Sequence, residues 1–191
     1  PADPEPVNAR NLARALASFQ RTLIATDTRF DRYMRGDSNA LSTSEKEGLN
    51  LFLSSGCAKC HNGPMFSDYK LHALGVPETD NFTEPDRGVN NDFAFRTPTL
   101  RNLRFTAPYM HSGKFTTLKQ VLEFYEDIAG GKLRNSHVRP EQIDPLVGAM
   151  NVNFRDINRI IEFLNVLSDD NFDKTFPEKV PSGLPPGGNL N

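Results

Sequence analysis

The stretch Cys57-Ala58-Lys59-Cys60-His61 decides how the chain is interpreted. Two cysteines separated by two residues, with a histidine directly after the second, form the attachment pattern of a c-type haem. Both thiols add to the vinyl groups along one porphyrin edge, which brings the next imidazole under the ring to bind the iron. The pattern therefore predicts Cys57 and Cys60 as the attachment points of one covalent haem c and His61 as the proximal ligand.

Closely spaced cysteines also occur in zinc sites and in redox-active dithiols. A structural zinc site needs about four Cys or His ligands at suitable spacing, and the sequence contains only two cysteines. A redox dithiol does not need the histidine that follows Cys60. Haem attachment is therefore the preferred interpretation, and it uses both cysteines of the chain.

Composition excludes several classes of partner. The 191 residues match the size of one domain, and the net charge of -2 comes with no basic stripe that would suit nucleic acid. No apolar run approaches the roughly 20 residues that span a bilayer, so we expect a soluble chain without a membrane span. The start, residues 1–6, lacks a charged-then-apolar leader, and we expect a mature chain or a fragment of a longer one.

Apolar periodicity predicts a mainly α fold with little β structure. Helices are expected over residues 7–25, 42–54, 117–129 and 153–167. Capping boxes mark two of the starts: Ser42 with Glu45, overlapped by Ser44 with Glu47, and Thr117 with Gln120.

Two segments lack helical periodicity. Residues 26–41 are expected to form a loop, and residues 62–116 a long loop with a short strand near Tyr69 to Ala73. The haem would order the long loop by packing against its aromatic residues, Phe66, Phe82, Phe93, Phe95 and Phe105. We therefore expect a cytochrome c-like helical haem domain over residues 1–176, followed by a Pro/Gly-rich strap or tail over 177–191.

Two further segments carry a family resemblance. Residues 95–103, Phe-Arg-Thr-Pro-Thr-Leu-Arg-Asn-Leu, and residues 106–113, Thr-Ala-Pro-Tyr-Met-His-Ser-Gly, resemble the C-terminal haem domain of bacterial di-haem cytochrome c peroxidases and of MauG. The similarity extends to residues 30–37, 61–64 and 122–125, and so covers nearly the whole chain. Family members carry two haem motifs, whereas this sequence has one and contains no tryptophan.

The resemblance implies a periplasmic oxidoreductase in which this haem relays electrons. They would pass between an external redox partner protein and a second, catalytic haem that a missing half or another chain supplies. Two alternatives stay open from the residues alone. One is a free-standing periplasmic monohaem electron carrier, and the other is a haem-based sensor with an open sixth position on the iron.

The sixth iron ligand is open among several residues: Met34, Met65, Met110, Met150, His72, His111, His137 and the four tyrosines. The resemblance places it at Tyr125, counted from Pro108, where the peroxidases have a methionine and MauG-like proteins a tyrosine. The alternative is that Tyr125 is an ordinary core residue on the apolar face of its helix. Met110 is the runner-up ligand.

Other site residues follow from the resemblance or from their charge. Thr106 and Pro108 match positions whose backbone carbonyls bind calcium in the family, although Ca²⁺ takes about six to eight oxygens and a loop without metal is the alternative. Arg96 and Arg101 could bind haem propionates, with surface salt bridges as the alternative. His72 is expected to be solvated or hydrogen-bonded to backbone.

Overall fold

The computed structural model describes residues 5–23, 25–79, 84–170 and 178–183. The chain divides into two compact units: residues 1–25 together with 170–191, and residues 26–169. The predicted boundary at residue 176 falls outside the described residues and stays a prediction. The cysteine-histidine motif lies in the second unit.

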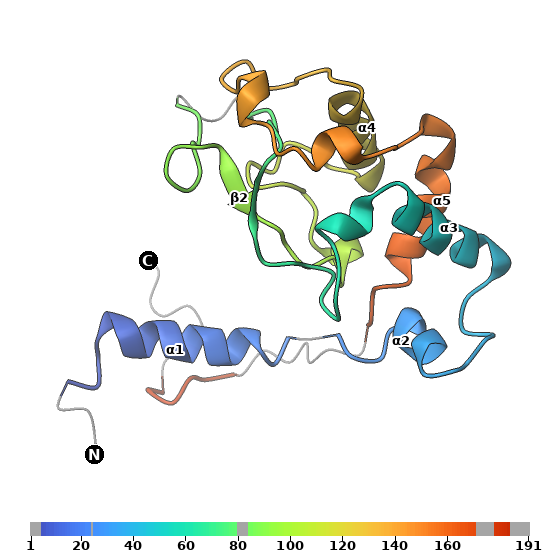
Figure 1. Cartoon of the computed structure of the whole chain (residues 1–191). Helices are drawn as coiled ribbons and strands as arrows, with labels where there is room; N and C mark the ends of the chain where they lie inside the picture. The colour runs from blue at the N-terminus through green and yellow to red at the C-terminus, as the bar shows by residue number, and fades with distance from the viewer. Residues whose placement is uncertain (1–4, 24, 80–83, 171–177, 184–191) are drawn as a thin grey trace. The chain divides into compact units, whose positions relative to one another are not determined.

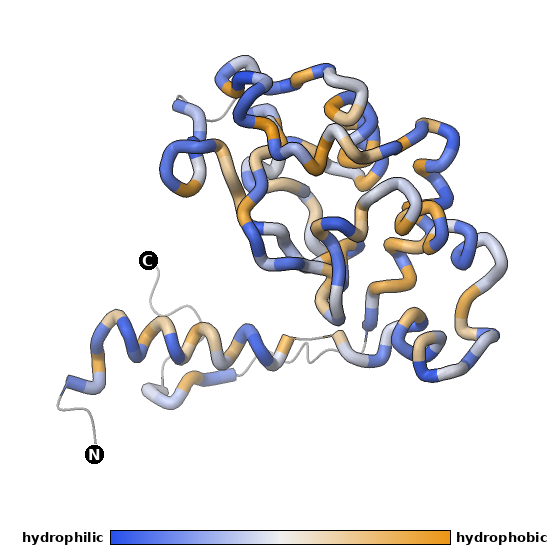
Figure 2. The backbone as a smooth tube through the Cα atoms, in the orientation of Figure 1, coloured by the Kyte–Doolittle hydropathy of each residue, from blue (hydrophilic) through white to orange (hydrophobic). Residues whose placement is uncertain are grey.

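In the first unit, helix α1 spans Ala9–Gln20. It is shorter than the predicted 7–25, because the Asn8 side chain caps its start by accepting from the backbone N–H of Asn11 and the helix closes at Arg21. Figure 2 shows apolar and polar residues alternating along this helix. The periodicity therefore identified the helix correctly but not its ends.

The described residues of the second unit form short helices and a two-stranded sheet (Figure 1). Its α-helices are α2 (Arg29–Met34), α3 (Thr43–Ser54), α4 (Leu118–Ala129) and α5 (Ile157–Asn165). The 3-10 helices are η1 (Cys57–Lys59), η2 (Leu103–Phe105), η3 (Pro140–Gln142), η4 (Val147–Ala149) and η5 (Phe154–Asp156). Strands β1 (Leu71–Ala73) and β2 (Ala94–Arg96) pair antiparallel. The predicted mainly α class with little β structure is confirmed.

Helix α2 lies where the sequence predicts a loop. Its start has a reciprocal cap, in which the Thr28 side chain accepts from the backbone of Asp31 and the Asp31 carboxylate accepts from the backbone of Thr28. The prediction over residues 26–41 was wrong because a six-residue helix is too short to show an apolar period.

Helices α3 and α5 pack side by side and support the segment that carries the cysteines (Figure 1). The predicted capping box of Ser42 with Glu45 starts α3. Ser44 does not use Glu47, because its hydroxyl donates to Glu162 on α5 instead. A tertiary contact has replaced a local one.

A cluster of phenylalanines forms the centre of the larger core. Phe30, Phe52, Phe66 and Phe163 meet with ring centroids 5.2–6.2 Å apart. Phe66, expected against the haem, belongs to this cluster, and Phe105 is 43% exposed. Phe82 lies outside the described residues. Phe93 and Phe95 line a cavity that Cys57 and Cys60 also line, so the described aromatic residues of the long loop are divided among the core, the cavity wall and the surface.

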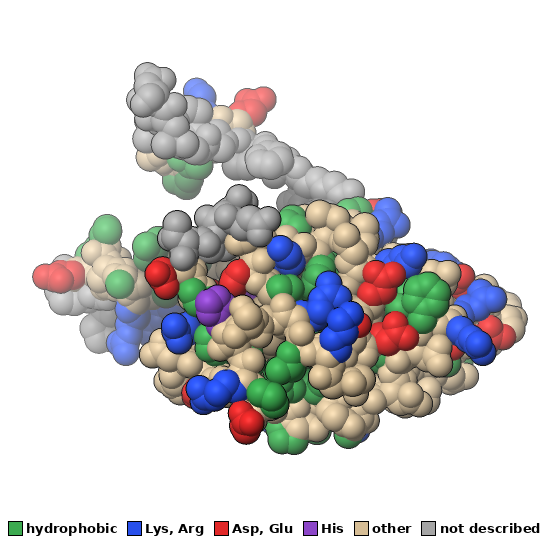
Figure 3. Space-filling view, turned by 90° about the horizontal axis from the view of Figure 1, so that it is seen from above, with side chains coloured by type: hydrophobic (Ala, Val, Ile, Leu, Met, Phe, Trp, Pro, Cys, Tyr) green, Lys and Arg blue, Asp and Glu red, His purple; other side chains and the backbone are tan. Residues whose placement is uncertain are grey.

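The surface mixes both signs of charge. Figure 3 shows Lys and Arg side chains interspersed with Asp and Glu on the face in view. Among the described residues, none of the helices has the length and apolar character needed to cross a bilayer.

Candidate haem site

The second unit contains a cavity of about 500 Å³ that brings the predicted site residues together. Cys57, Cys60, His61 and Tyr125 all line it. Most of the remaining wall is apolar, with contributions from α3, α4, α5, β2 and the loop over residues 97–111. An apolar cavity with a few polar groups suits a flat hydrophobic cofactor.

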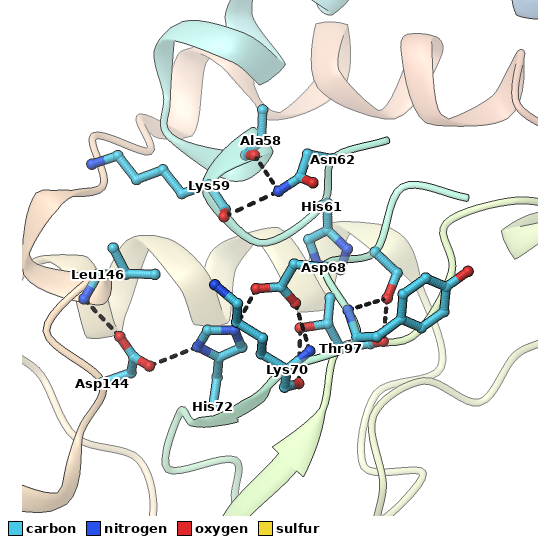
Figure 4. Close-up of polar contacts among 12 residues, drawn as sticks. Ala58, Lys59, His61, Asn62, Asp68, Lys70, His72, Thr97, Asp144 and Leu146 are labelled. Carbon is cyan, nitrogen blue, oxygen red and sulfur yellow. Dashed lines mark hydrogen bonds and ion pairs between the residues drawn. The ribbon is translucent and has the colours of Figure 1, made fainter. Parts of the chain in front are cut away.

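The haem motif forms a compact turn directly after α3. Gly56, which separates α3 from η1, has φ +88°, a left-handed conformation that favours glycine. The Asn62 side chain donates to the carbonyls of Ala58 and Lys59, both at 3.3 Å, and closes the turn (Figure 4). Lys59 Nζ donates to the carbonyl of Ala149 at 2.8 Å and ties the turn to η4.

His61 is held in the tautomer that a metal ligand needs. Its Nδ1 lies 3.0 Å from the carbonyl oxygen of Phe66. A carbonyl only accepts, so Nδ1 carries the proton and Nε2 keeps the lone pair. Burial lowers the pKa of His61, although the Phe66 carbonyl opposes this shift, and the ring is kept neutral. The orienting contact is of the kind that metal-binding histidines use.

The two cysteines are free thiols in a protected environment. Burial raises the pKa of Cys57 and of Cys60 to about 11. A thiol with so high a pKa is almost entirely protonated at neutral pH and is a weak metal ligand. The protected thiols are compatible with covalent haem attachment, and zinc is disfavoured because the sequence has no further cysteines to complete its ligand set.

Tyr125 reaches the cavity from α4, whose start is fixed as predicted by Thr117 and Gln120. Burial, with smaller contributions from Cys57 and Cys60, raises the pKa of the phenol above its usual value of 10. Tyr125 therefore faces the same cavity as the two cysteines, and it stays protonated at neutral pH unless a cation draws the proton away.

Other candidates for the sixth ligand are only partly brought to the cavity. Met110, Met150, His72, His111 and Tyr109 line it together with Tyr125. Among the described residues, Met34, Met65, His137, Tyr33 and Tyr69 lie outside the lining. The structure shortens the list of ligands, and the choice of Tyr125 over Met110 stays a prediction.

The two arginines predicted to bind propionates both line the cavity but differ in their partners. Arg101 donates through both terminal nitrogens to the carboxylate of Asp31, at 2.7 and 2.8 Å, and through Nε to the carbonyl of Pro64. Arg96 is exposed, and its guanidinium stacks 4.8 Å from the ring centre of Tyr69. Arg101 thus already has a carboxylate partner within the protein.

The predicted calcium residues, Thr106 and Pro108, are exposed residues of the loop that lines the cavity. In the same loop, the Tyr109 hydroxyl donates to the carbonyl of Leu103 at 3.0 Å and the Tyr109 backbone N–H to Phe115 at 2.7 Å. The loop is therefore ordered by the protein's own contacts. Calcium at this position stays a prediction.

His72 contradicts its expectation, because it is buried and held by two carboxylates. Its Nδ1 lies 2.6 Å from Asp144 Oδ2 and its Nε2 lies 3.0 Å from Asp68 Oδ2 (Figure 4). Burial alone would lower the pKa of His72, but the contacts with Asp144 and Asp68 raise it above the usual 6.5. The four-residue spacing of Asp68 and His72 gave no sequence signal for this contact, because residues 68–72 are coil and strand rather than helix.

In the described part of the chain, one group of three metal-binding side chains comes together, namely Cys60, Asp68 and His72, with ligand atoms within 4.8 Å of one another. Both ring nitrogens of His72 already face carboxylates, and Cys60 is held as a thiol. His72 therefore has no ring lone pair to offer a metal, and the three side chains as placed do not form a complete ligand set.

Comparisons with known proteins identify the family of the chain. The sequence profile described as "Di-haem cytochrome c peroxidase" matches residues 2–39. The cytochrome c551 peroxidase of Nitrosomonas europaea is 33% identical over 188 residues, covering 92% of this chain and 49% of the relative. The methylamine utilization protein MauG of Methylorubrum extorquens is 39% identical over 137 residues, covering 69% of this chain and 38% of the relative.

A solved structure shows the same fold. A MauG-like protein associated with microbial copper homeostasis superimposes with a TM-score of 0.69 at 24% identity, covering 89% of this chain and 56% of that chain. The chain spans less than half the length of the two curated relatives described above. With the haem motif, the cavity and these relatives in agreement, the chain belongs to the bacterial di-haem cytochrome c peroxidase/MauG family.

Proposed function

We propose that this chain is a haem c domain that relays electrons within a di-haem peroxidase or MauG-like oxidoreductase. Cys57 and Cys60 attach the haem, and His61 and Tyr125 bind its iron. The second, catalytic haem comes from a further part of the same protein or from another chain, and an external redox partner exchanges electrons with this one. The relatives' lengths support a second half, since this chain spans only part of them.

One observation carries the proposal. Cys57, Cys60, His61 and Tyr125 line the same apolar cavity, although Tyr125 follows the haem motif by more than sixty residues in the sequence. The residues also fit the group chemically. Nε2 of His61 has the lone pair, and the thiols are reduced and protected. A bound haem supplies a one-electron couple at its iron.

The protein's own residues would set the properties of that couple. The Phe66 carbonyl fixes the His61 ring and raises its basicity. The Tyr125 phenol, which burial keeps protonated, would give up its proton to become an anionic ligand, as metals enforce on other ligands. An anionic oxygen stabilises ferric iron, so the potential should be lower than with a methionine ligand.

The Tyr125→Phe variant tests the ligand assignment. Removing the phenol oxygen should open the sixth position, change the ferric optical spectrum, and allow cyanide to bind faster. Absorption spectra and cyanide titrations of the purified ferric protein measure both effects. A wild-type protein that binds cyanide as readily as the variant would indicate an open position and favour the haem-based sensor.

Met110→Leu is the matched control, because Met110 lines the same cavity. It should leave the ferric spectrum nearly unchanged. If Met110→Leu changed the spectrum and Tyr125→Phe did not, the ligand would be Met110. The domain would then be a His/Met electron-transfer domain.

The haem count of the native particle tests the relay role. Two haems per particle, with electrons passing between them, would support it, whereas one haem on a particle of about 21.4 kDa would favour the free-standing electron carrier. Covalent haem attachment also leads us to propose a periplasmic location. Calcium between the haem domains, at Thr106 and Pro108, belongs to the same proposal, and ion analysis of the native particle measures it.

A further inference from the structure

The cluster of Asp68, His72 and Asp144 has a geometry that neutral imidazole cannot satisfy. Both ring nitrogens of His72 lie within hydrogen-bond distance of a carboxylate oxygen, 2.6 Å for Nδ1 and 3.0 Å for Nε2. A neutral ring has one N–H and one lone pair, and a lone pair facing a carboxylate is repelled. Both nitrogens must therefore carry protons, and the ring is an imidazolium that donates to Asp144 and to Asp68.

The imidazolium of His72 lies in the wall of the cavity proposed to hold the haem. His72 and Asp144 both line the cavity, and His72 and Asp68 each have a ligand atom within 4.8 Å of Cys60 Sγ. His72 and Asp68 are 9% and 8% exposed in their side chains, so water screens the charges only weakly. A change of one charge at a haem attached to Cys60 would therefore change the proton affinity of His72 in the cluster.

We propose that the Asp68–His72–Asp144 cluster is a proton-binding site coupled to the haem, which holds its proton more tightly when the iron is reduced. The inference rests on the proposed haem at Cys57 and Cys60. A one-electron donor reduces ferric to ferrous iron, and the loss of one positive charge favours the His72 proton. Where the ferric protein has lost that proton, reduction takes one up from solvent onto a ring nitrogen of His72, which balances the charge.

Other groups near His72 do not provide this response. Cys60 would be a thioether after haem attachment and would not titrate, and His61 would be fixed by the iron. Lys59 and Lys70 act electrostatically on Cys60, but lysines stay charged through the neutral pH range. Asp68 has its pKa lowered to about 2, because the Lys70 backbone N–H and His72 outweigh the effect of burial, so it stays ionised.

The midpoint potential measured as a function of pH tests the proposal. The potential should be flat at acid pH and fall on the alkaline side of pH 6.5, since contacts with both carboxylates hold the His72 proton above its usual range. The slope should approach 59 mV per pH unit, which is tenfold in proton activity for a one-electron couple. Spectroelectrochemical titration of the haem-loaded protein between pH 5 and about pH 9 gives this curve.

Two variants and a control test whether His72 causes the pH dependence of the midpoint potential. His72→Gln should abolish the decrease in potential at alkaline pH. Asp144→Asn leaves His72 one carboxylate partner and should shift the start of this decrease to lower pH. His137→Gln removes an exposed imidazole outside the cluster and should keep the wild-type curve. If His72→Gln does not fold or load haem, the shift in Asp144→Asn carries the test.

Failure of the inference differs from failure of the proposed function. A wild-type potential that does not vary with pH, in a protein with normal haem content and ferric spectrum, overturns the coupling and leaves the haem site intact. A wild-type slope in His72→Gln overturns it too. Loss of the haem assignment would instead appear as absent covalent haem in the wild-type protein.

Discussion

At the scale of single residues, burial decides how much an ion pair contributes. Arg101 and Asp31 make two parallel hydrogen bonds with side chains only 9% and 16% exposed. Arg29 and Glu45 make the same two-fold contact, at 2.7 and 2.6 Å, and Glu45 is 15% exposed, close to Asp31, but the Arg29 side chain is 44% exposed. The geometry is alike and the surroundings differ, so the two pairs form a matched comparison.

We predict that Arg101→Gln destabilises the domain strongly. The Arg101 side chain is 9% exposed, so water cannot readily take the place of the lost guanidinium beside Asp31, and loss of such a partner costs about 3–5 kcal/mol in comparable pairs. Arg29→Gln should cost no more than about 1 kcal/mol, as exposed pairs do. Urea unfolding of the two variants measures the difference. Equal decreases in the free energy of unfolding for the two variants would show that the lower exposure of the Arg101 pair adds nothing to its contribution to stability.

Hydrogen bonds between residues close in the sequence could be predicted, whereas contacts between residues far apart in the sequence could not. The cap of Thr117 with Gln120 was visible because its residues are three apart. The Asp144 partner of His72 was not, because 72 residues separate them and no local rule connects them. Ser44 has the correct spacing to Glu47, yet a residue 118 positions away takes its hydroxyl. Tertiary contacts decide such cases.

At the scale of elements, the contact between α3 and α5 depends on Gly48. A Cβ built at this position would overlap the carbonyl oxygen of Arg159 and lie 2.9 Å from its carbonyl carbon. The two backbones therefore approach more closely than any larger residue allows. Sequence periodicity located both helices, but it could not show that a glycine within α3 was a contact point rather than a weak helix former.

We predict that Gly48→Ala destabilises the domain although alanine is the better helix former. Helix propensity alone would add about 1 kcal/mol of stability, but separating α3 from α5 should cost about 1–3 kcal/mol or more. Gly148→Ala is the control, because no atom lies within 4 Å of the Cβ built there. Thermal unfolding of both variants measures the effect. A Gly48→Ala protein more stable than wild type would contradict the close approach.

At the scale of the whole second unit, the cavity sets the condition for a stable fold. An empty cavity costs about 24 cal/mol per Å³ of its volume, so about 500 Å³ corresponds to on the order of 10 kcal/mol. That equals the total stability of a typical domain, about 5–15 kcal/mol. This value is an upper limit, because the cavity is partly open to solvent, and a bound apolar group that fills the cavity would remove the cost. The haem motif predicted such a group from the sequence, whereas the cavity walls come from segments whose meeting only the fold determines.

Removal of the haem tests this argument. We predict that Cys57→Ala with Cys60→Ala loses haem on a denaturing gel, where covalent haem stays with the wild-type chain. The haem-free chain should keep helical far-ultraviolet circular dichroism but lose the near-ultraviolet signal of fixed aromatic packing, because the walls collapse without specific packing. Phe93, Phe95 and Tyr125 line the cavity and should lose their fixed surroundings first, whereas Phe66 and Phe163 pack together away from it. A haem-free double variant with native near-ultraviolet dichroism and cooperative unfolding would show that the protein alone holds the cavity open.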